Sequence, residues 1–236
     1  MNPFTYHTPI LGYHRVGPVK GDHVPTVSAH AFERQLSFLT RHHVHVATLD
    51  EVVASLDRGE PFPRRSVVIT FDDGYEETYT VAWPLLQRWK LSATLFIAPA
   101  EVGLPGFVTW QQLAEMAKDG MTIGSHTMHH AYLPLLSPEG LQEELIESKR
   151  VIEQRIGLPV QFVSYPVGGF TPQAQESARQ AGYLAAFTTN RTASRSMIDR
   201  YALRRIKVTE RDSSPMLFWA KVSGYYDGFR RLKDPS

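Results

Sequence analysis

The sequence predicts an α/β fold, a barrel of parallel strands covered by helices, and three observations support this class. Short apolar runs rich in β-branched residues alternate along the chain with longer segments whose apolar residues recur at helical spacing. The connections between them are short, which is typical of parallel strands joined by helices. The chain has 236 residues and no linker-like change in composition. We therefore expect a single domain over residues 1–236, closed as a barrel.

In the first half of the chain, capping and turn residues bound the expected elements. Ser28 and Asp50 are expected N-caps of two helices, and Gly59 is expected to end the second. Gly74 ends the most apolar strand, and Pro84 should bend the helix that follows. The expected elements are strands 10–14, 44–47, 67–71 and 93–97, a loop over 17–27, and helices that start at Ser28, Asp50 and Glu76.

The second half of the chain continues the alternation. Thr109 and Ser137 begin two helices, which end at Gly120 and Gly157. The expected strands are 121–124, 161–165, 183–189 and 202–208, and the remaining helices are 172–181 and 215–225.

Composition and charge exclude several classes of function. A formal net charge of +1, with the basic residues scattered, argues against a nucleic-acid partner. The absence of cysteine excludes disulfides, thiolate catalysis and zinc fingers. Because the chain does not open with a basic and then an apolar segment, and has no apolar span of about 18 residues, we expect no signal peptide, no membrane span and a cytoplasmic location. Nothing in the pattern indicates an oligomeric state.

Polar side chains gather at the carboxyl ends of the expected strands, the end at which parallel barrels carry their active sites. They are His14, Asp72, Asp73, His126, His130 and the segment 164–168. An aspartate and two histidines four positions apart supply three ligands to a borderline divalent metal and leave further positions open. Each motif alone is also typical of a surface turn, but their joint occurrence at strand ends favours a metal centre.

The two aspartates and the two histidines of this cluster each need a particular backbone conformation to reach one site. Adjacent strand residues point to opposite faces, so Asp72 and Asp73 reach one site only if the chain turns, which Gly74 permits. A helical turn over residues 126–130 would place His126 and His130 on one side.

Three segments resemble the first three motifs of the polysaccharide deacetylases, the NodB-homology enzymes of carbohydrate esterase family four. They are Thr-Phe-Asp-Asp-Gly at 70–74, His-Thr-Met-His-His at 126–130 and Ser-Tyr-Pro-Val-Gly at 164–168. The resemblance extends over nearly the whole chain, from Leu11 to Val208. It implies a deformed barrel of about seven parallel strands and hydrolysis of N-acetyl groups on an N-acetylated saccharide. It also implies a divalent metal, zinc first, with Co²⁺, Ni²⁺ or Mn²⁺ as alternatives.

The resemblance also assigns roles to individual residues. Asp73, His126 and His130 would hold the metal, and Asp72 would be the general base that takes a proton from the attacking water. The backbone N–H of Val167, which follows the proline of the third motif, would stabilise the tetrahedral oxyanion. A general acid must then protonate the departing sugar nitrogen.

The chain departs from the better-known family pattern at two points. All ten histidines lie at or before His130, so the late histidine that usually serves as the acid is missing. Ser164 stands where the third motif normally has an arginine that pairs with the base. We hypothesise that His14 supplies the acid or orients the leaving group, and that Arg205 restores the missing positive charge beside Asp72. The alternative for both is a purely structural role.

Four residues are candidates for contact with the sugar. Tyr165 and Pro166 belong to the third motif, and Tyr75 and Trp110 lie on loops expected at the same end of the barrel. Aromatic faces suit the C–H faces of sugar rings, although ordinary packing is the alternative for each aromatic ring.

The expected function is therefore metal-dependent removal of N-acetyl groups from an amino sugar or saccharide, with O-deacetylation as a variant. One alternative keeps the site but hydrolyses another C–N bond, such as that of a small cyclic amide. A second alternative is a catalytically impaired carbohydrate-binding protein, suggested by the missing arginine and histidine. Neither the saccharide nor its length follows from the sequence.

Overall fold

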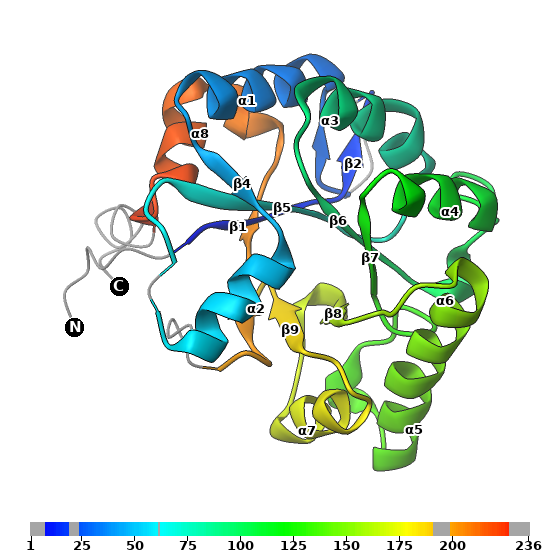
Figure 1. Cartoon of the computed structure of the whole chain (residues 1–236). Helices are drawn as coiled ribbons and strands as arrows, with labels where there is room; N and C mark the ends of the chain where they lie inside the picture. The colour runs from blue at the N-terminus through cyan, green and yellow to red at the C-terminus, as the bar shows by residue number, and fades with distance from the viewer. Residues whose placement is uncertain (1–7, 19–23, 61, 191–198, 227–236) are drawn as a thin grey trace.

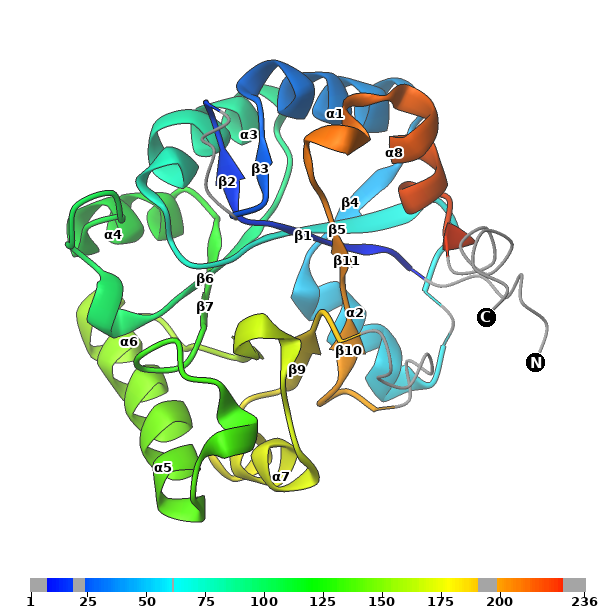
Figure 2. The ribbon, with the colours of Figure 1, turned by 180° about the vertical axis from the view of Figure 1, so that it is seen from behind.

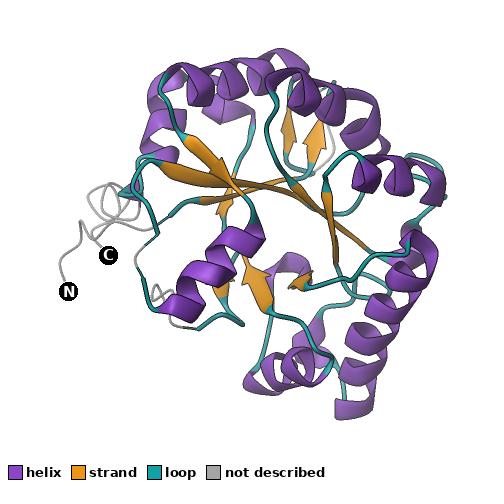
Figure 3. Cartoon of the chain, in the orientation of Figure 1, coloured by secondary structure: helices purple, strands orange, loops and turns teal. Residues whose placement is uncertain are grey.

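The structure, a computed structural model, describes residues 8–18, 24–60, 62–190 and 199–226. Within these ranges a parallel sheet curls into a nearly closed barrel, and helices cover its outside (Figures 1 and 3). The α/β barrel predicted from the sequence is confirmed.

The strands follow one another around the barrel in the order β10, β9, β8, β7, β6, β5, β1 and β11, and neighbouring strands are parallel. They are β1 (Ile10–Tyr13), β5 (Ser66–Phe71), β6 (Thr94–Ile97), β7 (Thr122–Ser125), β8 (Phe162–Ser164), β9 (Ala185–Thr188), β10 (Leu203–Arg204) and β11 (Ile206–Lys207). A further strand, β4 (His45–Ala47), pairs with the start of β5.

The barrel closes through the run of residues 203–207. Its first part, β10, pairs with β9, and its second part, β11, pairs with β1 (Figure 2). Arg205 separates the two parts, and its N–H donates to the carbonyl of Thr188 at 2.8 Å. Because 203–207 is one run of chain, the path β1, β5, β6, β7, β8, β9 and 203–207 contains seven strands. This agrees with the expectation of about seven.

Helices form the outer layer and connect the strands. They are α1 (Ala29–Arg41), α2 (Leu49–Arg58), α3 (Trp83–Trp89), α4 (Trp110–Lys118), α5 (Pro138–Gln142), α6 (Ser148–Ile156), α7 (Pro172–Gln180) and α8 (Pro215–Val222). No helix in the described ranges is long and apolar enough to span a bilayer.

Alternation along each strand divides the buried side chains between two layers. One cluster joins side chains from strands all around the sheet to α2, which packs against it through Leu49 and Val52. Its strand members are Ile10, Ala47, Val68, Phe96, Phe162, Ala185, Phe187 and Leu203. The strand residues next to them, such as Ile69 and Val163, belong to the larger cluster that includes the helices. Within the barrel, a Cβ at Gly124 would lie 2.5 Å from the Phe96 ring, so only glycine leaves room for that ring.

Local structure differs from the sequence prediction in three places. Thr48, two residues before Asp50, caps α2, because Thr48 and Glu51 form a reciprocal capping box. The helix expected over 137–157 is α5 and α6 joined by a π-helical turn, η4 (Glu143–Glu147). The end of the loop predicted over 17–27 is a short strand, β3 (Thr26–Val27), which pairs with β2 (Arg15–Val16) as a small second sheet.

Candidate active site

The carboxyl ends of the strands bring the polar residues together at one end of the barrel. His14 follows β1, Asp72 follows β5, and His126 follows β7. Ser164 is the last residue of β8, and Arg205 lies between β10 and β11. Each stands two or four positions after an inward residue of its strand, such as Ile10, Val68 or Phe162, so period-two alternation directs these side chains into the barrel.

A buried ion pair occupies the centre of this cluster. Arg205 donates from Nη1 to Asp72 Oδ1 at 2.7 Å and from Nη2 to Asp72 Oδ2 at 2.6 Å, and both side chains are almost fully buried. The guanidinium also donates to Thr70 Oγ1 at 3.0 Å and to Ser164 Oγ at 2.7 Å. Burial raises the pKa of Asp72, but the charges of Arg205 and His126 and the hydrogen bonds from Arg205 together outweigh burial, so the pKa of the carboxyl stays below its ordinary value and the group is ionised at neutral pH.

Asp73 reaches the same end of the barrel through a local backbone turn. Its φ of 73° is in the left-handed region, and Gly74 follows with φ of 78°. A Cβ at Gly74 would lie 2.9 Å from Ile97 Cγ2, so both the conformation and the space require glycine. The turn predicted at this point is present, although it begins at Asp73 itself.

Asp73 and two imidazoles form a group with the geometry of a metal site. Asp73 Oδ1 lies 3.4 Å from His126 Nε2 and 3.3 Å from His130 Nε2. This oxygen is buried and has no hydrogen-bond partner among the described residues, although buried oxygens normally have one. One carboxylate and two imidazoles are the donor set of zinc and similar divalent cations, so the residues present fit such an ion.

The electrostatics of this group favour a cation as well. Burial raises the pKa of Asp73, but contacts with His126 and His130 lower it more, so the carboxyl is held well below its ordinary range. The contact with Asp73 raises the pKa of His130 despite partial burial. His126 Nδ1 lies 2.7 Å from the carbonyl oxygen of Ser164, which makes that nitrogen the donor and leaves Nε2 free to bind a cation.

Residues 126–130 are not a helical turn, so the condition under which helical spacing would bring His126 and His130 to one side is not met. Thr127 has φ of 66° and His130 has φ of 56°, and the segment has no regular secondary structure. These left-handed residues reverse the chain, and the reversal, rather than helical spacing, lets His126 and His130 face the same carboxylate. Left-handed backbone is uncommon for a β-branched residue such as Thr127 and must be held by its surroundings.

His14 lies close to both aspartates. Its Nδ1 is buried and has no hydrogen-bond partner in the described part of the chain. Burial lowers the pKa of His14 from its ordinary value of 6.5, and the carboxylates of Asp72 and Asp73 oppose that shift.

Val167 combines exposure with an unusual backbone. Its side chain is 77% exposed, and its φ is 57°, which is a genuine outlier for a β-branched residue. Gly168 follows with φ of 75°, and a Cβ there would lie 2.8 Å from the backbone nitrogens of Thr189 and Asn190. The turn after β8 therefore places Val167 at the surface of the strand ends, where strained backbone often accompanies function.

The four residues expected to contact sugar differ in their surroundings. Tyr165 is fully buried: its ring stacks on Phe170 and its hydroxyl donates to the carbonyl of Tyr201. Ser164, the last residue of β8, points inward, and Tyr165 directly after it points outward into the helix layer, which argues against contact with a sugar. Pro166 is buried as well, which argues against contact with a sugar.

Tyr75 and Trp110 are both partly exposed. Arg15 lies 4.1 Å from the centroid of the Tyr75 ring, and Phe107 stacks on that ring at 5.2 Å. Burial, followed by the charge of Asp73, raises the pKa of Tyr75 to about 12, so this ring lies near Asp73. Trp110 begins α4, packs against the outer core and lies near Arg155 of α6, an arrangement typical of ordinary packing.

Sequence reasoning missed Glu144, a buried carboxylate that contacts the 126–130 segment. A signal was available: Leu141, Leu145, Ser148 and Ile152 define a buried helical face, and Glu144 lies on the same face. A lone acidic residue on an apolar face implies a buried partner.

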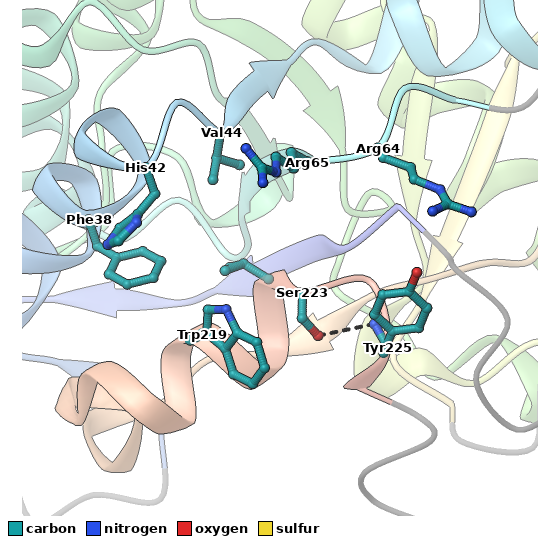
Figure 4. Close-up of a pocket in the computed structure, with 9 residues that line it drawn as sticks. Phe38, His42, Val44, Arg64, Arg65, Trp219, Ser223 and Tyr225 are labelled. Carbon is teal, nitrogen blue, oxygen red and sulfur yellow. Dashed lines mark hydrogen bonds between the residues drawn. The ribbon is translucent and has the colours of Figure 1, made fainter.

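A cavity of about 390 Å³ lies at the opposite end of the barrel, next to the amino-terminal ends of β4 and β5 (Figure 4). Residues that line it are Phe38, His42, Val44, Arg64, Arg65, Trp219, Ser223 and Tyr225. It shares no residue with the candidate active site.

A parallel barrel with an aspartate pair and two histidines at its strand ends defines the NodB-homology class of deacetylases. The chain belongs to the polysaccharide deacetylase family, whose model matches residues 59–186. It is 31% identical over 201 residues to YxkH of Bacillus subtilis (strain 168), covering 85% of this chain and 71% of that protein. It is 28% identical over 199 residues to the poly-beta-1,6-N-acetyl-D-glucosamine N-deacetylase of Staphylococcus aureus (strain MRSA252), covering 78% and 68%.

Two solved structures illustrate the shared fold. The Streptococcus pyogenes deacetylase PplD in complex with acetate superposes with a TM-score of 0.83 at 26% identity, covering 92% of this chain and 99% of that one. IcaB from Ammonifex degensii superposes with a TM-score of 0.80 at 27% identity, covering 92% and 98%.

Proposed function

We propose that this protein is a metal-dependent hydrolase that removes N-acetyl groups from a saccharide containing N-acetylglucosamine. One observation carries the proposal. The buried Asp73 Oδ1, which has no hydrogen-bond partner among the described residues, faces two imidazole nitrogens and follows directly after the ionised Asp72. The staphylococcal relative that acts on poly-β-1,6-N-acetylglucosamine supports the choice of substrate class. A divalent cation held by Asp73, His126 and His130, zinc first, would polarise the acetyl carbonyl and lower the pKa of a nearby water.

Asp72 is assigned as the general base. Its two oxygens are held by Arg205, which fixes the carboxylate in one orientation and keeps it deprotonated, as a base must be. Both oxygens retain lone pairs beyond those that face the guanidinium, so the carboxylate can still accept a proton from water. Arg205 is a positioning residue, because it touches the base and not the substrate.

Two further groups would act on the tetrahedral intermediate. The backbone N–H of Val167, at the exposed turn after β8, would donate to the oxyanion. His14 lies close to both aspartates and would give a proton to the departing amine, because an amide anion is a very poor leaving group.

Acetate release from N-acetylglucosamine oligomers, β-1,6-linked among them, tests the proposal. We expect acetate and free amine in equal amounts, with the reaction abolished by a chelator and restored by zinc. Turnover of a small cyclic amide but of no acetylated sugar would point to hydrolysis of a different C–N bond. Saccharide binding without release of acetate would identify a binding protein and overturn the proposal.

The His14→Ala variant should keep its metal and lose about 100-fold in turnover, near the lower end of what a general acid contributes, because solvent near this half-buried residue can partly replace the proton donor. His30→Ala, an exposed histidine on α1, is the matched control. Steady-state kinetics and zinc content are the measurements. Wild-type turnover in His14→Ala would show that the histidine is structural.

A further inference from the structure

The segment that carries both histidine ligands, residues 126–130, needs contacts with the rest of the protein to stabilise its conformation. It has no regular secondary structure and contains two left-handed residues, Thr127 and His130. Its ends are fixed: the His126 N–H donates to the Ile97 carbonyl at 2.8 Å, and the Ala131 N–H donates to Thr127 Oγ1 at 3.2 Å. Between the ligands, the Met128 carbonyl accepts from the Ala100 N–H at 3.0 Å, and the N–H groups of Met128 and His129 need acceptors.

Glu144 supplies those partners. Its Oε2 accepts from the N–H of Met128 and from the N–H of His129, both at 2.9 Å, and its Oε1 lies 2.8 Å from His129 Nδ1. The Glu144 side chain is 10% exposed, whereas the His129 side chain is 56% exposed. One buried carboxylate therefore binds two successive backbone N–H groups, and hydrogen bonds to a charged acceptor are stronger than neutral ones.

The element that bears Glu144 is itself anchored to the strand that leads into the segment. Glu144 lies in the π-helical turn η4, and π-helical turns within α-helices are frequent at functional sites. One turn later, Ser148 Oγ lies 2.7 Å from Ser125 Oγ, at the end of β7. The α5–η4–α6 segment thus contacts both the end of β7, just before the ligand-bearing segment, and the middle of that segment.

We propose that Glu144 is a positioning residue for the metal site, which acts by holding the backbone between His126 and His130 in the shape that directs both imidazoles at Asp73. Glu144 is not itself a ligand, since the metal-type cluster found among the described residues comprises Asp73, His126 and His130 alone. Without the carboxylate, two part-buried backbone N–H groups would lose their acceptor, and the left-handed residues beside them would relax. The proposal rests on the proposed function only in that the site binds a divalent cation.

The test is the zinc dissociation constant, measured by competition with a chromophoric chelator. Glu144→Met keeps the side-chain volume but removes the acceptor, and it should weaken zinc binding about 10- to 100-fold, the range for residues that orient metal ligands. Glu144→Gln retains an oxygen for the two N–H groups and should recover most of that loss. His129→Ala, which leaves both N–H contacts intact, should bind zinc nearly as tightly as the wild type.

Glu143→Ala, an exposed glutamate one position earlier, is the matched control and should bind zinc like the wild type. Urea unfolding of the metal-free proteins separates a loss of fold from a loss of metal-site geometry. Wild-type zinc affinity in a folded Glu144→Met variant would overturn the proposal, as would a Glu144→Gln variant that binds zinc as weakly as Glu144→Met. A wild-type protein that binds no zinc would instead refute the proposed function.

Discussion

The Asp72→Asn variant should bind zinc like the wild type and release acetate about 10²- to 10⁴-fold more slowly, the range that a positioned general base contributes. Asparagine has nearly the same shape and can still accept from Arg205, but its amide cannot take a proton from water. Because Asp72 is outside the group of residues whose atoms converge on Asp73 Oδ1, the metal site should be intact. Single-turnover acetate release and zinc content measured on the same sample check both halves of the prediction.

Asp50→Asn is a suitable control for Asp72→Asn, since Asp50 is exposed in the first turn of α2 and is not one of the residues of the candidate active site. It should change neither turnover nor zinc content. If Asp72→Asn kept more than a tenth of wild-type turnover, another group would have to be the base. If it lost its zinc, the separation of roles between Asp72 and Asp73 would be wrong.

The Arg205→Ala variant should be destabilised by about 3–5 kcal/mol, because removing one partner of a buried ion pair leaves the other charge without compensation. The pKa of Asp72 should rise, since burial raises it and the guanidinium that lowers it would be gone. A base works only when deprotonated, so the acidic limb of the kcat/KM profile should move to higher pH. Urea unfolding and the pH dependence of acetate release measure the two effects.

Arg58→Ala is the matched comparison for Arg205→Ala. Arg58 pairs with Glu60 at 2.6 Å, but both side chains are more than half exposed, and surface ion pairs contribute about 0–1 kcal/mol. An Arg205→Ala variant that unfolds like Arg58→Ala and keeps the wild-type acidic limb would show that the arginine does not set the charge state of the base.

Much of the site could be predicted because the ends of the strands, and the alternation of inward and outward side chains along each strand, can be read from the sequence. The carboxyl ends of parallel strands meet at one face, so His14, Asp72 and His126 were bound to be near one another once the strands were identified. The same alternation should have excluded Tyr165, because a residue next to the inward Ser164 must point outward. That prediction relied on motif position and ignored the two-residue period.

The backbone of the ligand-bearing segments could not be predicted. Asp73, Thr127 and His130 adopt left-handed conformations that ordinary residues rarely visit, and only tertiary contacts hold them there. Glu144 supplies such contacts from a distance of more than a dozen residues, across a π-helical turn that no local pattern announces. The pairing of Arg205 with Asp72 depends likewise on barrel closure, which brings the last strand beside β1.

Titration of chelator-stripped protein with zinc, with bound metal and acetate release followed in the same samples, tests the central claim most directly. The three converging ligands predict that acetate release from an N-acetylglucosamine oligomer rises in proportion to bound zinc and saturates at one ion per chain. Full acetate release by protein that contains no metal, or zinc binding that leaves the rate unchanged, would contradict the assignment of Asp73, His126 and His130 as the catalytic metal site.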